Sequence, residues 1–77
     1  LEETVEAREL GRLITHFLSG LTSMQRVMFL RRYYFGDAVR MIAQDLEITP
    51  NACSVRLSRI RDELRNYLER EGYCYEK

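Results

Sequence analysis

Apolar residues recur every three or four positions along the chain, which is the spacing of an amphipathic α-helix. No stretch shows the alternation of apolar and polar residues that marks a half-buried strand. The pattern predicts four helices, at about residues 3–18, 22–34, 38–46 and 50–70. We therefore expect an all-α fold in which residues 1–77 form a single domain with a tail at residues 71–77.

Capping residues stand where three of these helices begin. Thr22 and Gln25 have the spacing of a capping box, in which each side chain accepts a hydrogen bond from the other residue's backbone N–H. Asp37 is the expected N-cap of the third helix. Thr49 is a good N-cap, and Pro50 after it suits the first position of a helix.

Glycines mark the ends of three predicted helices. Gly20 is expected to end the first helix in a left-handed conformation, and Gly36 and Gly72 to end the second and the fourth. Gly11 lies within the first helix instead, where a missing β-carbon would admit a close helix neighbour.

The apolar face of each helix is expected to form the core. The inward positions predicted for the last three helices are Val27, Met28, Leu30 and Tyr34, then Val39, Ile42, Ala43 and Leu46, then Cys53, Leu57, Ile60, Leu64 and Leu68.

The third and fourth helices have the layout of a helix-turn-helix, a short helix followed by a turn of a few residues and a longer capped helix. The small Ala43 suits the point where two steeply crossing helices come closest, and Ile48 in the turn can fill the corner below it. A plain helical bundle with a short loop is the alternative.

The polar side of the fourth helix carries side chains that read DNA in other proteins. A recognition helix contacts base edges with its N-terminal turns. Asn51 can pair with adenine, Val55 can touch a thymine methyl, and Arg56 or Arg59 can reach guanine or phosphate. For each of these residues alone, solvated helix surface is the alternative interpretation.

The net charge of zero conceals an uneven distribution. Residues 1–22 hold two arginines and four glutamates, residues 23–61 hold seven arginines and three acids, and residues 62–77 hold three basic and five acidic residues. The segments therefore carry −2, +4 and −2, and 11 of the 12 basic residues are arginine. The guanidinium fork suits phosphate and guanine, so the positive middle is compatible with a nucleic acid partner. Ordinary solvated helix surface is the alternative, and charge alone does not decide between the two.

Catalytic and metal-binding patterns are missing from the sequence. His16 is the only histidine and is expected to pack or lie on the surface, Cys53 is expected to be a buried thiol, and Cys74 falls in the tail. We therefore expect no enzyme, no metal, no cofactor and a reduced, cytoplasmic protein. The longest apolar run, Val27–Leu30, is too short to span a membrane, and the start at Leu1 leads us to expect a C-terminal fragment of a longer chain.

Residues 29–65 read FLRRYYFGDAVRMIAQDLEITPNACSVRLSRIRDELR. This stretch resembles region 4 of the sigma-70 superfamily of RNA polymerase sigma factors, of the extracytoplasmic-function type. The likeness rests on Leu21–Arg26, Arg32–Tyr34, Ile42–Ala43 and Ser54–Arg59 and extends over about residues 10–70. Two departures stand out, since Glu47 replaces a glycine usual in the turn and Ser54 replaces a usual lysine.

The resemblance implies a winged-helix-like DNA-binding domain that recognises the −35 promoter element in the major groove. It also implies binding to the flap of the polymerase β subunit, with an anti-sigma factor as a further partner. Carried over by position, the residues facing DNA are Asn51, Ala52, Ser54, Val55, Arg56 and Arg59, with Arg32 and Arg40 near the backbone. If Glu47 holds a left-handed conformation, it does so at a cost of about 1 kcal/mol.

Two other functions remain open from the sequence. A LuxR-type output domain also has four helices with a helix-turn-helix, and it dimerises through its last helix. A helical protein-interaction module is the second, with an exposed patch formed by Tyr33, Tyr34, Phe35 and Met41.

Overall fold

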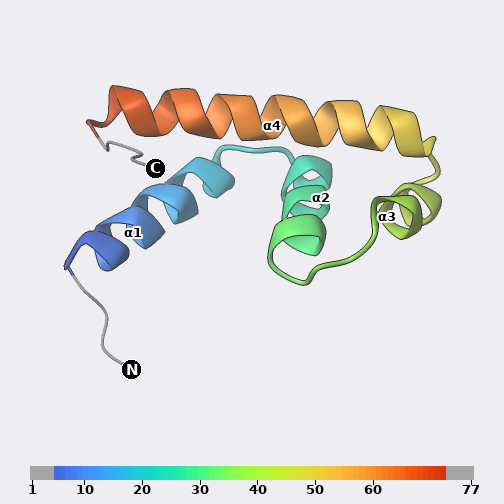
Figure 1. Ribbon diagram of the computed structural model, residues 1–77, viewed down its shortest axis with the longest axis horizontal. Helices are drawn as coiled ribbons and strands as arrows, with labels where there is room; N and C mark the ends of the chain where they lie inside the picture. Colours follow the sequence, from blue (N-terminus) through green and yellow to red (C-terminus); the bar gives the residue numbers. More distant parts are fainter. Residues whose placement is uncertain (1–4, 73–77) are drawn as a thin grey trace.

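The computed structural model describes residues 5–72, which form four helices and no strand (Figure 1). The helices are α1 (Val5–Ser19), α2 (Ser23–Tyr33), α3 (Val39–Leu46) and α4 (Pro50–Arg70). The all-α class is confirmed, and the helix bounds agree with the predicted ones to within about two residues. The expectations for residues 1–4 and for Cys74 lie outside the described residues.

The longest helix, α4, is the common partner of the other three. It lies along one side of the molecule. From its first residue to its last, α4 passes α3, then α2, then α1 (Figure 1). At 1.5 Å per residue, its 21 residues extend about 31 Å. α2 also packs against α3, so three helices pack on one another at the end of the molecule where α4 begins.

The core lies at that end, where α2, α3 and the first turns of α4 meet. Its fully or almost fully buried members are Met28, Ile42, Ala43, Cys53 and Leu57, with Val39, Leu46 and Ile48 packed around them. The predicted positions of Ala43 at the helix crossing and Ile48 below it are thereby confirmed. Burial of each large side chain contributes about 1.5–3 kcal/mol, which fixes the angle between α3 and α4.

The predicted apolar stripe of α2 is wrong in two positions. The helix buries Met28 and Phe29, whereas Val27 is 45% and Tyr34 77% exposed. Since successive residues of a helix are turned by about 100°, the inward position of Met28 leaves Val27 outside. Tyr34 is the C-cap and stands beyond the last turn.

The start of α2 is built as predicted. Thr22 Oγ1 accepts a hydrogen bond from the Gln25 backbone N–H at 3.2 Å, and Gln25 Oε1 accepts one from the Thr22 N–H at 3.0 Å. Gly36 follows α2 with φ of 78°, and Gly72 follows α4 with φ of 84°, so both adopt the left-handed conformation.

The predicted end of α1 before Gly20 is confirmed, but the predicted left-handed conformation is wrong, because Gly20 does not have a positive φ. The chain turns there through a hydrogen bond from the Gly20 N–H to the Phe17 carbonyl at 3.1 Å. The guanidinium of Arg26 in α2 then donates to the carbonyls of Leu18 at 3.0 Å and Leu21 at 2.9 Å. A side chain from the next helix thus joins the last turn of α1 to the connection that follows it.

Two further local predictions are also wrong. Ala38, not Asp37, is the N-cap of α3, and it makes no side-chain capping bond. Asp37 Oδ2 instead lies 2.7 Å from Nε of Arg31, a charged partner that outcompetes a backbone N–H. Gly11 admits no close helix, because a β-carbon there would meet nothing within 4 Å.

Candidate nucleic-acid interface

The turn between α3 and α4 is fixed by backbone hydrogen bonds. Glu47 ends α3 with φ of 61° and ψ of 43°, so a non-glycine residue does hold the left-handed conformation predicted from the sequence. The Ile48 N–H donates to the Ala43 carbonyl at 3.0 Å, which closes the turn. Thr49 Oγ1 accepts from the Ala52 N–H at 3.0 Å, and Pro50 is the first residue of α4, both as predicted.

The six residues predicted on the reading face lie together on the first three turns of α4, a stretch that we call the reading strip. Five of them are exposed and Ala52 is half-buried. Val55, the apolar member, is 41% exposed. The reading strip comprises Asn51, Ala52, Ser54, Val55, Arg56 and Arg59.

One flank of the reading strip faces the start of α2. Arg56 and Arg59 line a surface hollow of about 400 Å³ there, together with Met24 and Gln25. Arg56 Nη1 lies 3.6 Å from the sulfur of Met24, a weak acceptor that leaves the guanidinium charge uncompensated. Glu63 lines the same hollow one turn further along α4 and places a negative charge at its edge.

The other flank faces the end of α2. Here Arg32 lines a hollow with Ser54, which brings a predicted backbone contact beside the reading strip. Ser58 and Arg61 line the same hollow, and both are absent from the predicted site. Their positions four and seven residues after Ser54 place them on the same side of a helix, a signal that the sequence already contained.

The family model for region 4 of sigma-70 matches residues 11–64. The chain belongs to the sigma-70 region 4 family. No curated protein matches the chain. The family is one of DNA-binding domains that act in transcription initiation and bind the RNA polymerase core, and not a family of enzymes.

The positive charge of the region 4 domain is only partly available to DNA. Arg26 donates hydrogen bonds to the carbonyls of Leu18 and Leu21, at and just after the end of α1. Arg31 binds Asp37 through Nε and Asp45 through Nη1, both at 2.7 Å. The hydrogen bond that Arg31 donates to Asp37, followed by the one that it donates to Asp45, raises the pKa of Arg31. Five of the seven arginines in residues 23–61 are therefore left to face a partner.

The two predicted backbone contacts differ in setting. Arg32 Nη1 donates to the Asp37 carbonyl at 3.1 Å, which holds the side chain near the first turn of α3. Arg40 lies on α3, is exposed, and makes no hydrogen bond or ion pair within the described part of the chain. The structure thus places Arg32 beside the reading strip but does not bring Arg40 into either flanking hollow.

Cys53 lies directly behind the reading strip of the region 4 domain. Its side chain is fully buried, and burial raises the pKa of the thiol, although the charges of Arg56 and Arg32 act in the opposite direction. The protonated thiol therefore serves as a small apolar group, as predicted. The action of both charges on Cys53 places the two arginines close to the first turns of α4.

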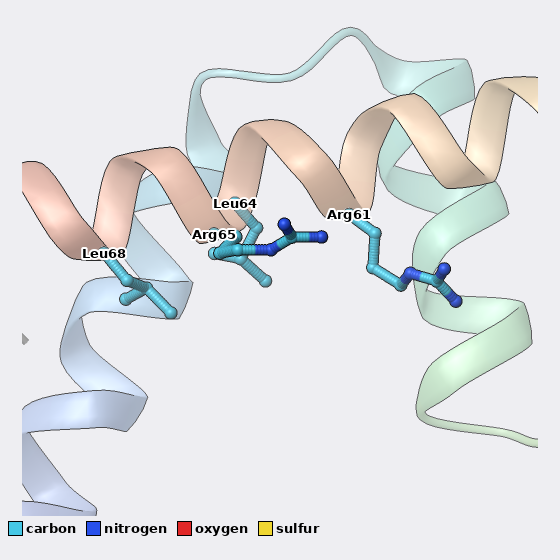
Figure 2. A pocket seen from close by; sticks show the side chains of 4 residues that line it. All are labelled: Arg61, Leu64, Arg65 and Leu68. Atoms are coloured by element: carbon cyan, nitrogen blue, oxygen red, sulfur yellow. The ribbon is translucent and has the colours of Figure 1, made fainter. Parts of the chain in front are cut away.

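Two other surfaces of the region 4 domain lie away from the reading strip. A hollow of about 210 Å³ is lined by Arg61, Leu64, Arg65 and Leu68, and Figure 2 shows the Arg61 side chain extending from α4 toward α2. After α2, the exposed rings of Tyr34 and Phe35 stack edge to face with centroids 5.0 Å apart. Both surfaces combine apolar groups with basic or polar edges.

Two further kinds of feature concern residues 5–72, namely clusters of metal ligands and membrane-spanning helices. Within that range no three His, Cys, Asp or Glu side chains gather in a way that suits a metal ion. None of the four described helices is both long and apolar enough to cross a membrane.

Proposed function

We propose that this region 4 domain recognises the −35 promoter element as part of the RNA polymerase holoenzyme, in a factor of the extracytoplasmic-function type. The observation that supports the proposal is the exposed reading strip at the start of a capped helix whose angle to α3 is fixed by a buried core. Asn51 and Arg59 present the amide and guanidinium groups that pair with adenine and guanine in the major groove. This role places the domain in the cytoplasm with the chromosome.

Arginine contacts to phosphate supply most of the affinity in this proposal. Arg32, Arg40 and Arg56 are the exposed arginines assigned to the DNA backbone. About three phosphate contacts give a slope of log affinity against log salt of roughly −3, which is typical of weak binding by a small domain. Attachment to polymerase raises the effective DNA concentration to about the millimolar range and compensates for this weakness.

The polymerase flap is assigned to the surfaces away from the reading strip. The exposed rings of Tyr34 and Phe35 offer apolar contact area, and a flap segment that covers them removes that area from water. An anti-sigma factor that occupies the same rings would block assembly with polymerase. Replacement of Phe35 by alanine is expected to weaken binding to core polymerase while leaving binding of the chain to duplex DNA unchanged.

The test of −35 recognition is an Arg59→Ala substitution in the factor that carries this domain, assembled with core polymerase. Binding to a promoter with its −35 element is expected to fall about tenfold or more, because a bidentate base contact is worth roughly 1–3 kcal/mol. Binding to a promoter with a scrambled −35 element is expected to change much less.

The matched control is Arg12→Ala, which removes the same charge from the exposed surface of α1, where Arg12 pairs with Glu9. This variant is expected to bind both promoters like the unsubstituted factor. Equal losses for Arg59→Ala on the two promoters would contradict base recognition by the reading strip. A stable dimer of the chain in solution would favour the LuxR-type alternative.

A further inference from the structure

The flank of α4 beside the end of α2 contains a hollow whose polar lining is suited to a phosphate group. Its volume is about 210 Å³. Val39 and Leu57 contribute apolar surface to it. The polar side chains around it carry only hydroxyl and guanidinium groups, from Arg32, Tyr33, Ser54, Ser58 and Arg61.

Most hydrogen-bond donors around this hollow are unused. Arg61 Nη1 donates to the hydroxyl of Tyr33 at 3.2 Å, and Arg32 Nη1 donates to the Asp37 carbonyl at 3.1 Å. Because each guanidinium has five N–H groups, most of the donors of both arginines stay available. The Ser54 and Ser58 hydroxyls make no hydrogen bond within the described residues and lie on one side of α4, four positions apart.

We propose that this hollow seats one phosphodiester of the DNA backbone, bound by the guanidinium groups of Arg32 and Arg61. The inference rests on the proposed function and adds Arg61 to the binding site. A helix with its side chains is 10–12 Å across and the major groove is about 12 Å wide, so the flanks of a recognition helix lie against the phosphates at the groove edges. Ser54 and Ser58 stand beside Val55 and Arg59 of the reading strip, at such a flank.

The direction of the Arg61 side chain distinguishes a contact with a DNA phosphate from a contact with polymerase. Arg61 lines the hollow formed with Leu64, Arg65 and Leu68 as well, but Figure 2 shows its side chain extending toward α2. The bond to Tyr33 holds the guanidinium against the end of α2, where Arg32 also stands. The opposite flank lacks this arrangement, since a carboxylate, Glu63, lines its hollow.

The first experiment measures the salt dependence of binding between the chain and a fluorescent duplex containing a −35 element. Arg61→Gln is expected to weaken binding about tenfold and to make the slope of log affinity against log salt shallower by about one. Arg65→Gln is the control, because it removes the same charge one turn along α4 from an arginine paired with Asp62. The control is expected to leave the slope unchanged, and an unchanged slope for Arg61→Gln would overturn the proposal.

The second experiment identifies the phosphate. A series of duplexes, each with one neutral methylphosphonate, is titrated with the unsubstituted chain, with Arg61→Gln and with Arg32→Gln. One position is expected at which neutralisation weakens the unsubstituted chain about tenfold but has little further effect on either variant, since the two changes remove the same contact. Additive effects at every position overturn the phosphate site while leaving DNA recognition intact.

A comparison of two duplexes separates this proposal from the function on which it rests. Loss of affinity for Arg61→Gln is expected to be equal on a −35 duplex and a scrambled duplex, because a phosphate contact carries no base information. A loss confined to the −35 duplex overturns the assignment of Arg61 to the backbone. Absence of any duplex binding by the unsubstituted chain overturns both this site and the proposed function.

Discussion

The two halves of α4 are attached to the rest of the molecule in different ways. Residues 50–60 bury Cys53 and Leu57 in a cluster that α2 and α3 complete. Residues 61–70 meet α1, where Leu68 is buried and the Tyr67 ring lies 5.6 Å from that of Phe17, centroid to centroid. An apolar cluster formed by three helices fixes an angle, whereas a pairing of two helices mainly holds them side by side.

The two halves of α4 also differ in charge. Residues 50–60 contain two arginines and no acid, whereas residues 61–70 contain three arginines and three acids. In the second half Arg65 pairs with Asp62 at 3.0 Å, an exposed pair worth at most about 1 kcal/mol. The half with the fixed angle thus carries a net positive charge, as the proposed recognition of DNA requires, whereas the second half has no net charge.

The largest effect is expected when the cluster of the first half is broken. Ile42→Ala removes a fully buried side chain and is expected to lower the free energy of unfolding by about 2–5 kcal/mol, measured by denaturant titration followed by circular dichroism. The control is Met41→Ala, because Met41 is 54% exposed, and its effect is expected to stay within about 0.5 kcal/mol. Similar losses for the two variants would contradict a core centred on Ile42.

Leu13→Ala tests the attachment of the second half. Leu13 is 3% exposed, and its loss is expected to cost about 2–3 kcal/mol. Faster hydrogen exchange is expected in α1 and residues 61–70, while residues 39–60 stay protected by their own cluster. Exposed Thr15 provides the control variant Thr15→Ala. Uniformly faster exchange throughout the chain would show that the two halves are one cooperative unit.

Glu47→Gly is expected to stabilise the first half. Glycine relieves a left-handed residue that costs roughly 1–2 kcal/mol, but it also gains freedom in the unfolded chain, so the net gain is about 0.5–1 kcal/mol. Glu47→Gln keeps the β-carbon and is expected to bring no gain. Equal stabilities of the two variants in thermal unfolding would rule out backbone strain at Glu47.

The smallest effect is expected at the surface between α1 and the second half. His16 Nδ1 and the Tyr67 hydroxyl are 3.0 Å apart, and the two rings stack. Tyr67→Phe removes this exposed hydrogen bond and is expected to cost about 0.5–1 kcal/mol in thermal unfolding. Tyr34→Phe is the control, because the Tyr34 hydroxyl makes no hydrogen bond within residues 5–72. A neutral Tyr67→Phe would show that the ring packing alone joins the helices there.

Local signals in the sequence predicted the helix starts of α2 and α4 because each cap lies within three residues of its partner. The capping box of Thr22 and Gln25 and the pair Thr49 and Pro50 need no tertiary contact. The conformation of the connection after α1 was not predictable in this way, since Arg26 reaches the carbonyls of Leu18 and Leu21 only after α2 has packed in place.

The candidate site also has a part that local sequence signals predicted and a part that they did not. Helical spacing was enough to place the reading strip on one face of α4, because that depends on one helix alone. The sequence did not show which arginines are paired within the protein and which are available to DNA. That depends on how separate helices meet, as in the pairing of Arg31 with Asp37 and Asp45 and the approach of Arg61 to Tyr33. Charge counted along the sequence therefore overestimated what is available to DNA.

The position of α4 after its three partners has a consequence for synthesis of the protein. As the chain leaves the ribosome, α1, α2 and α3 emerge before the helix on which all three pack. The three are 15, 11 and 8 residues long, at or below the length at which isolated helices hold in water. Folding therefore waits for α4, and we expect that Ile42 and Met28 stay accessible to chaperones until then.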